Sequence, residues 1–448
     1  MGRVAFSSER RASIGKCPAS RCESLPRAYR LAAIFHRPHP YFCKFFQHLA
    51  AQPGIDLTVY FYSDMGVGAT FDAGFQRSVQ WDTDLLGGYK NHFLRNCAPR
   101  PDLSRYLGTF HPGLLYELGR GYDAVIQHGW WGFSSSLAMA TILLQGTPLF
   151  MHSDKNAIEP MGPPHGSLRD KILPRLFRRA AGFLVTGQSN GDFYRKMGVQ
   201  SEKMFWTPLA VDNAYFQSEK LRLEAQRGTI RREMGIPLDS VVFLYVGRLD
   251  MRKGLMDLLR AFATLSSPST RLIFAGDGPD RACLENYAEQ HAISHVHFAG
   301  MQNYSELPRF YAISDVFVLP SHHEPWGAVI NEAMNFGLPI VASRVVGAAA
   351  DLVCDGTSGE GANGLLFDPG DVAGLADRLQ FLLERPGLRK QMGKESAGRI
   401  AGWNYDCAVE GVLAALRSVA RPCEGNENLR DGTPRSLSGG GSDLLPIG

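Results

Sequence analysis

The chain has 448 residues, a formal net charge of +3, 44% apolar residues and 10% aromatic residues. This composition, with 20% charged residues, excludes a disordered chain or a coiled coil, and the length predicts about two or three globular domains. The small net charge excludes the concentrated basic face that a nucleic-acid partner requires.

The two ends of the chain differ from the middle. Residues 1–28 contain several arginines but no apolar core of a signal peptide, so we expect a disordered extension, with a transit peptide as the alternative. The sparse, scattered cysteines predict a cytoplasmic location. The eight cysteines form no CxxC motif and no zinc-ligand spacing, and we interpret them as reduced thiols. Residues 421–448 are rich in Gly and Ser and predict a disordered tail.

The middle of the chain alternates short apolar runs with helix-length segments, beginning with Leu31–Phe35, Phe42–Ala51 and Leu57–Tyr62. Such a pattern is typical of parallel sheets covered on both faces. A second series begins at Val241–Val246, and the polar segment Thr207–Gly235 between the two predicts a hinge. We therefore expect an α/β fold of two doubly wound, Rossmann-like domains across a cleft, spanning 29–207 and 208–402.

The strongest local motif has two carboxylates around the expected start of a helix, in Glu324-Pro-Trp-Gly-Ala-Val-Ile-Asn-Glu332. Two carboxylates at this spacing can contact separate hydroxyl groups of one polyhydroxy ligand. Gly327 allows close approach of the backbone, and the first amides of the helix form an anion site. The alternative is two solvated acids beside an ordinary helix start.

A second motif places two cations after the first strand of the second series. Arg248, in Gly-Arg-Leu, and Lys253, in Lys-Gly, precede an expected helix. At the carboxyl edge of a parallel sheet, two cations beside a helix N-terminus match a diphosphate in charge and geometry. Isolated surface charges are the alternative interpretation.

Taken together, these motifs resemble the GT-B retaining glycosyltransferases of family 4. The resemblance covers roughly residues 241–368 in order and spacing, with the further matches Gly276–Pro279, Phe298–Gly300 and Ser314–Ser321. It implies that Trp403–Val419, within 403–420, is a final helix that returns to the N-terminal domain.

The resemblance also implies roles for individual residues. Arg248 and Lys253 would bind the leaving diphosphate, Glu332 the ribose hydroxyls, and Glu324 would lie beside the donor sugar. The backbone of Trp326, Gly327 and Ala328 would contact sugar and phosphate, with Gly300 near the same nucleotide-sugar site. His152, and alternatively His128, would face the reacting sugar or the acceptor; backbone-satisfied loop histidines are the other interpretation.

Metal and membrane contacts are weaker hypotheses. Asp82-Thr-Asp84 is a DxD pair, but it lies in the irregular segment 64–121 without partner acids, so we expect neither a metal nor a cofactor. The basic, amphipathic segment Leu168–Ala180 is compatible with peripheral contact at the inner face of a membrane, although a solvated face over a packed stripe is the simpler interpretation.

The sequence therefore predicts an enzyme that transfers a sugar from a nucleotide diphosphate sugar to a hydroxyl acceptor. Two other classes were weighed against it. An NAD-dependent oxidoreductase is excluded because neither first strand is followed by GxGxxG. A non-catalytic nucleotide-sugar-binding protein remains the alternative, and hydrolysis of the donor would distinguish the two.

Overall fold

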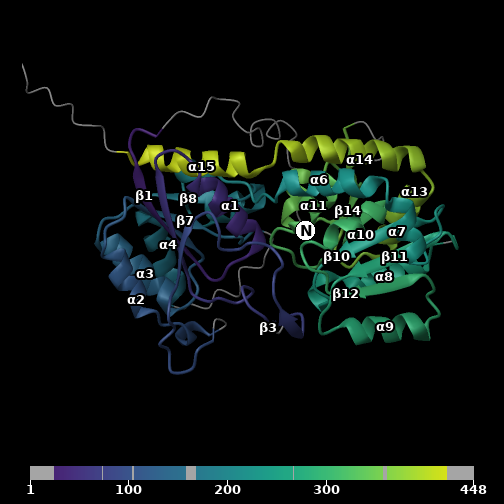
Figure 1. The fold of residues 1–448 in the computed structure, drawn as a ribbon, viewed down its shortest axis with the longest axis horizontal. Coiled ribbons are helices and arrows are strands. Elements are labelled where there is room, and N and C mark those ends of the chain that lie inside the picture. The colour runs from purple at the N-terminus through teal and green to yellow at the C-terminus, as the bar shows by residue number, and fades with distance from the viewer. Residues whose placement is uncertain are drawn as a thin grey trace, which may run out of the picture.

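The computed structural model describes residues 25–420 apart from 73, 103–104, 158–167, 266 and 357–360. The expected disordered segments 1–28 and 421–448 lie outside these residues, except for positions 25–28. Within the described chain, two parallel sheets form two domains side by side, with the N-terminal domain in purple and blue in Figure 1 and the C-terminal domain in green. This arrangement confirms the predicted fold class.

The N-terminal sheet has the order β5-β2-β1-β6-β7-β8-β9. Its strands are β1 (Tyr29–Phe35), β2 (Ile55–Phe61), β5 (Lys90–Phe93), β6 (Ala124–His128), β7 (Leu149–His152), β8 (Gly182–Val185) and β9 (Met204–Trp206). Its helices are α1 (Pro40–Ala50), α2 (Pro112–Leu118), α3 (Phe133–Leu144), α4 (Leu168–Arg179) and α5 (Gln188–Lys196), with single 3-10 turns at Tyr106–Gly108 and Ser201–Lys203.

Both faces of this sheet are buried, which explains its near-continuous apolar strands. Leu31 and Ala33 of β1 face one core, which includes Phe46 of α1, whereas Ala32 and Ile34 face another core under α2 to α5. Side chains of a strand alternate between faces, so adjacent apolar residues are needed to fill both cores.

The C-terminal sheet has the order β12-β11-β10-β13-β14-β15. Its strands are β10 (Val241–Val246), β11 (Thr270–Ala275), β12 (Val296–Gly300), β13 (Val316–Leu319), β14 (Ile340–Ser343) and β15 (Gly364–Phe367). Its helices are α6 (Asn213–Glu224), α7 (Arg227–Glu233), α8 (Leu255–Ala263), α9 (Arg281–Gln290), α10 (Leu307–Ile313), α11 (Val329–Asn335), α12 (Gly347–Leu352), α13 (Val372–Leu383) and α14 (Pro386–Ala401), with a 3-10 turn at Met251–Lys253.

The chain returns to the N-terminal domain at its end. Helix α15 (Tyr405–Ser418) lies beside α1 and β1 in Figure 1, on the side away from α2 and α3. Val409, Val412 and Leu416 pack into the same core as Leu31 and Phe46. The link between α14 and α15 is therefore one of the connections between the two domains.

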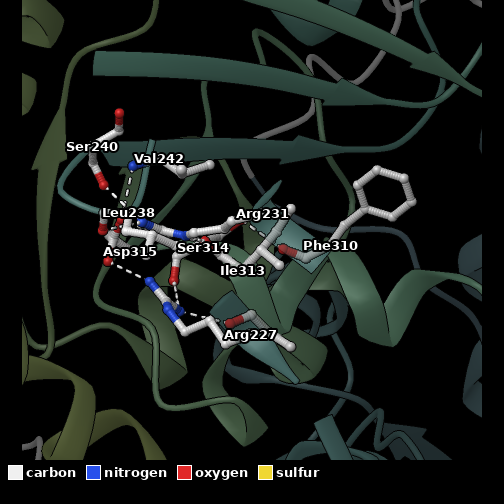
Figure 2. Close-up of polar contacts among 10 residues, drawn as sticks. Arg227, Arg231, Leu238, Ser240, Val242, Phe310, Ile313, Ser314 and Asp315 are labelled. Carbon is white, nitrogen blue, oxygen red and sulfur yellow. Dashed lines mark hydrogen bonds and ion pairs between the residues drawn. The ribbon is translucent and has the colours of Figure 1, made fainter. Parts of the chain in front are cut away.

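The polar segment Thr207–Gly235, where the sequence predicts a hinge, is largely helical. It folds into α6 and α7, and Phe216, Leu223 and Ile230 are buried in the C-terminal core. Arg231 of α7 is only 3% exposed. Its guanidinium donates to the backbone oxygens of Ile313 and Ser240 and to Asp315 (Figure 2).

Among the cysteines that the structure describes, one departs from the expected reduced state. Cys407 is disulfide-bonded, whereas Cys43, Cys97, Cys283 and Cys354 are free thiols. The eight cysteines are scattered along the chain, so their spacing does not predict this disulfide.

Between β2 and β5, a short antiparallel hairpin extends from the N-terminal domain toward the C-terminal domain. It consists of β3 (Thr70–Asp72) and β4 (Arg77–Val79), and β3 is labelled between the two domains in Figure 1. Arg77 forms an ion pair of 3.5 Å with Asp277 of the C-terminal domain. The irregular segment 64–121 thus contributes a contact between the two domains.

Candidate functional site

A cavity of about 320 Å³ lies between the two domains. Five of the predicted site residues line it from the C-terminal domain, namely Arg248, Lys253, Glu324, Gly327 and Ala328. The N-terminal domain contributes the opposite wall, made of Arg37, His39, Tyr41, Met65, Gly66, Asp72, Phe75, Val79 and Trp81. The cavity is therefore built by both domains.

The order of strands in the C-terminal sheet explains why these residues meet. Strand β10 pairs with β11 on one side and with β13 on the other, so the strand order reverses at β10. Arg248 follows β10 and Glu324 follows β13 after a short loop. Doubly wound sheets bind ligands at this reversal, outside the carboxyl ends of the strands.

Lys253 and Glu324 form an ion pair, with 2.7 Å between the Nζ atom and Oε2. The two side chains are 18% and 14% exposed, so the pair is largely shielded from bulk water. Gly254 follows Lys253 with φ at +63°, and a side chain there would overlap the carbonyl of Pro320. Only glycine allows the lysine loop to pack this closely on the end of β13.

Arg248 is held at the other side of the cavity. The buried Tyr245 hydroxyl donates to its backbone oxygen at 2.8 Å, which fixes the turn after β10. Its guanidinium lies 3.8 Å from the Asp72 carboxylate and over the ring of Phe75, both in the hairpin of the N-terminal domain. Its buried Nε has no hydrogen-bond partner among the described residues. A ligand anion in the cavity would supply such a partner.

Glu332 is fully buried, at 0% exposure, and does not line the cavity. Tyr41 donates to its Oε1 and Tyr311 donates to its Oε2, each at 2.6 Å. Burial raises the pKa of Glu332 to about 7, against the opposing effect of the two phenol donors. The structure thus places Glu332, the residue predicted to bind the ribose, behind Tyr41 as seen from the cavity.

The two histidines lie together but away from this cavity. His128 ends β6 and His152 ends β7, and their Nδ1 atoms are 2.8 Å apart in a hydrogen bond. Phe35 stacks on His128, and Phe42 packs edge-on against His152. Burial lowers the pKa of His128 to about 4 and lowers that of His152 well below its usual value. Both imidazoles are therefore neutral near pH 7.

Two further predicted residues lie off the cavity lining. The indole of Trp326 is buried, stacks on Trp403 and donates to Asn331, so its side chain serves the core. Gly300 ends β12 with φ at +73°, next to Arg281. The Asp82 and Asp84 pair is also engaged by other groups of the protein, because Asp82 accepts from Ser305 of the C-terminal domain and Asp84 accepts from the backbone of Gly87.

Residues of the N-terminal wall could be found from the sequence only in part. The stretch 65–75 is rich in glycine, but Asp72 and Phe75 carry no motif that marks them as cavity residues. Tyr41 follows a His-Pro pair at the start of α1, and nothing in the sequence pairs it with Glu332. Their roles depend on how the two domains face each other.

Two doubly wound sheets, facing each other across a cavity with cations at one wall, define the GT-B class of folds. Solved structures agree over most of the chain. Sucrose-phosphate synthase from Thermosynechococcus elongatus superposes with a TM-score of 0.63 at 19% identity, over 85% of this chain and 96% of that one. Anabaena Alr3699/HepE in complex with UDP-glucose superposes with a TM-score of 0.62 at 18% identity, over 86% and 98%.

Sequence comparison identifies the family. Residues 226–399 match the model of glycosyl transferases group 1. The D-inositol 3-phosphate glycosyltransferase of Acidothermus cellulolyticus is 31% identical over 321 residues, which cover 66% of this chain and 67% of that protein. The chain belongs to the glycosyl transferases group 1 family.

Other relatives match over shorter stretches. Sulfoquinovosyl transferase SQD2 of Arabidopsis thaliana is 35% identical over 200 residues, which cover 44% of this chain and 37% of that protein. The alpha-D-kanosaminyltransferase of Streptomyces kanamyceticus is 29% identical over 226 residues, covering 49% and 55%. The chain thus spans about a third to a half of these relatives, and the family model matches the domain that carries Arg248, Lys253 and Glu324.

Among residues 25–420, outside the gaps given above, no helix is long and apolar enough to cross a bilayer. In α4, Phe177 is buried and Leu173 and Leu176 pack against the N-terminal core, while Arg178 and Arg179 are exposed. The apolar stripe of this helix is therefore used inside the protein, which supports the interpretation of a solvated basic face.

Proposed function

We propose that this protein is a metal-independent, retaining glycosyltransferase of family 4 that transfers a sugar from a nucleoside diphosphate sugar to a hydroxyl acceptor. The observation that carries this proposal is the grouping of Arg248, Lys253 and Glu324 at one interdomain cavity, where the C-terminal sheet reverses its strand order. Solved structures of similar fold support the donor class, since Anabaena Alr3699/HepE was crystallised with UDP and with UDP-glucose.

The charges of the cavity suit departure of a diphosphate. As the glycosidic bond breaks, the sugar gains positive charge and the leaving phosphate gains negative charge. Arg248 and Lys253 are fixed at the cavity before the donor arrives, so they can stabilise this phosphate with little reorganisation. In front-side transfer, the same phosphate oxygen accepts the proton of the acceptor hydroxyl, and the new bond forms on the face that the leaving group vacates.

The remaining residues take supporting roles in this proposal. Glu324 acts at the sugar, Glu332 binds the ribose hydroxyls, and the backbone at Gly327 and Ala328 contacts sugar and phosphate. His152, paired with His128, lies on the acceptor side and offers a neutral imidazole to a sugar hydroxyl. The acceptor is a hydroxyl compound, and a cytoplasmic location is part of the same proposal.

Donor hydrolysis tests the proposal directly. The protein is incubated with UDP-glucose and, in parallel, with GDP-, ADP- and TDP-sugars, and release of nucleoside diphosphate is measured without acceptor. We expect slow release from one donor class and retention of this activity in EDTA. Binding without turnover would indicate the non-catalytic alternative. Loss of turnover in EDTA with recovery in Mn²⁺ would contradict the metal-free mechanism.

A further inference from the structure

Tyr41 connects the two domains at the most deeply buried carboxylate of the site. It lies at the start of α1 in the N-terminal domain, and its hydroxyl donates to Glu332 of α11 in the C-terminal domain at 2.6 Å. The hydroxyl of Tyr405, at the start of α15, donates to the backbone oxygen of Tyr41 at 3.0 Å. This hydrogen bond from Tyr405 holds the backbone of Tyr41 in place.

The same contact shields Glu332 from the cavity. Tyr41 lines the cavity, whereas Glu332 has no exposed surface. Tyr41 and Tyr311 together give each carboxylate oxygen a phenol donor. A hydroxyl group of a bound ligand can therefore reach Oε1 only after Tyr41 has moved away.

Arg248 and Lys253 show the same kind of arrangement with charged partners. Asp72 lies at 3.8 Å from Arg248 and Glu324 at 2.7 Å from Lys253, so carboxylates stand beside the cations that would bind phosphates. The partner of Glu332 is a hydroxyl group, the chemistry that a ribose would bring. Tyr41 and Asp72 both belong to the N-terminal domain, so two of these three contacts hold the domains together.

We propose that Tyr41 is an interdomain latch whose hydroxyl occupies the place of a ribose hydroxyl on Glu332 until a nucleotide displaces it. This inference rests on the proposed function, because it assigns Glu332 to the ribose. Displacement of Tyr41 separates the start of α1 from α11, so binding of the nucleoside is linked to the relative position of the domains. The latch lowers nucleotide affinity because the nucleotide must first break the contact between Tyr41 and Glu332.

The chain offers a matched control for this contact. Tyr311 also donates to Glu332 at 2.6 Å, but it lies in α10 of the same domain and does not line the cavity. Tyr41→Phe and Tyr311→Phe each remove one phenol hydroxyl from the same carboxylate. Only the first of these changes breaks a contact between the domains.

The experiment is calorimetry with UDP, GDP, ADP and TDP, and with inorganic pyrophosphate, on the wild type and both variants. It is carried out at pH 8, above the pKa of about 7 of Glu332, with thermal unfolding to check that each variant is folded. For the nucleotide that the wild type binds, Tyr41→Phe should increase affinity roughly three- to thirtyfold, and Tyr311→Phe should not increase it. Pyrophosphate has no ribose and should bind the wild type and Tyr41→Phe equally.

The possible outcomes separate the latch from the proposed function. If the wild type binds a nucleotide and Tyr41→Phe binds it with equal or lower affinity, the latch is wrong and the proposed function stands. An equal gain in both variants also contradicts the latch, because the domain contact would then be irrelevant. If the wild type binds no nucleotide, the proposed function is wrong and the latch is wrong with it.

Discussion

The ammonium group of Lys253 and the carboxylate of Glu324 lie 2.7 Å apart, although 71 positions separate them in the sequence. Their strands, β10 and β13, are neighbours in the sheet, which brings the two loops together at its carboxyl edge. In the described protein, the cation proposed to bind a phosphate is thus neutralised by the acid proposed to act at the sugar.

Because the two charges neutralise each other, mutation of Glu324 and mutation of Lys253 should affect nucleotide binding differently. Glu324→Gln removes the charge that neutralises Lys253, so free nucleoside diphosphate should bind at least as tightly as before. The value of kcat should nevertheless fall by on the order of ten- to a thousandfold, because Glu324 acts on the sugar in the transition state. Lys253→Ala should lower both nucleotide affinity and kcat. Calorimetry and steady-state kinetics measure these effects, and weaker nucleotide binding by Glu324→Gln would reverse our assignment.

Arg248 can be compared with a second arginine at the domain interface. Both Arg248 and Arg77 approach an aspartate of the opposite domain, at 3.8 Å and 3.5 Å, but only Arg248 lines the cavity. Arg248→Ala should weaken binding of nucleoside diphosphate by roughly ten- to a hundredfold, the effect of losing charged hydrogen bonds. Arg77→Ala should leave affinity within about twofold, and an equal loss in both variants would contradict a direct phosphate contact.

The histidine pair supplies a test of the acceptor side. His152 is only 6% exposed and hydrogen-bonds to His128. His152→Ala therefore alters the carboxyl end of strand β7 and leaves Arg248 and Lys253 unchanged. Nucleoside diphosphate should bind normally, while turnover should fall by roughly ten- to a thousandfold if the imidazole contacts the reacting sugar. Unchanged turnover would assign both histidines to packing alone.

Glu332 should give stability a recognisable dependence on pH. Burial raises its pKa from the usual 4.5 to about 7 in the folded state. The folded protein then holds this proton more tightly, so the stabilising contribution is complete below about pH 4.5 and is lost as the pH rises to about 7. Between pH 5 and pH 8, the unfolding free energy of the wild type should fall relative to Glu332→Gln by on the order of 2–3 kcal/mol.

Urea unfolding of both proteins at a series of pH values measures this difference. Histidine titration affects both proteins alike and cancels in the comparison. A difference that is constant with pH would mean that Glu332 is ionised in the folded protein throughout this range.

Arg231 of α7 is buried outside the cavity, and its loss should lower the free energy of unfolding strongly. Asp315 accepts from Arg231, from Arg227 and from the backbone of Val242, and Figure 2 shows these groups converging on one carboxylate. Arg231→Met leaves the Asp315 charge without its most buried partner and should cost about 3–5 kcal/mol of unfolding free energy. The neighbouring Arg232 is exposed, and Arg232→Met should change stability by less than about 0.5 kcal/mol. Equal effects in denaturant unfolding would contradict this role for the network.

The sequence by itself determined the fold class and the C-terminal half of the site. Apolar strands with side chains buried on both faces, separated by helices, are sufficient to indicate parallel doubly wound sheets. Because ligands bind at the carboxyl ends of such strands, the motifs around Arg248, Lys253 and Glu324 could be expected to meet. Each of these residues follows a strand directly or after a short loop, so local structure is enough to place it.

Only the tertiary structure decided what lies opposite these residues. Tyr41 is 291 positions from Glu332, and no local periodicity relates them. The charged run that contains Arg231 gives no sign of burial, yet this arginine is buried where α7 packs against the carbonyls of 313 and 240. Contacts of this kind depend on the docking of whole elements and domains, and a pattern within one segment carries no information about its distant partner.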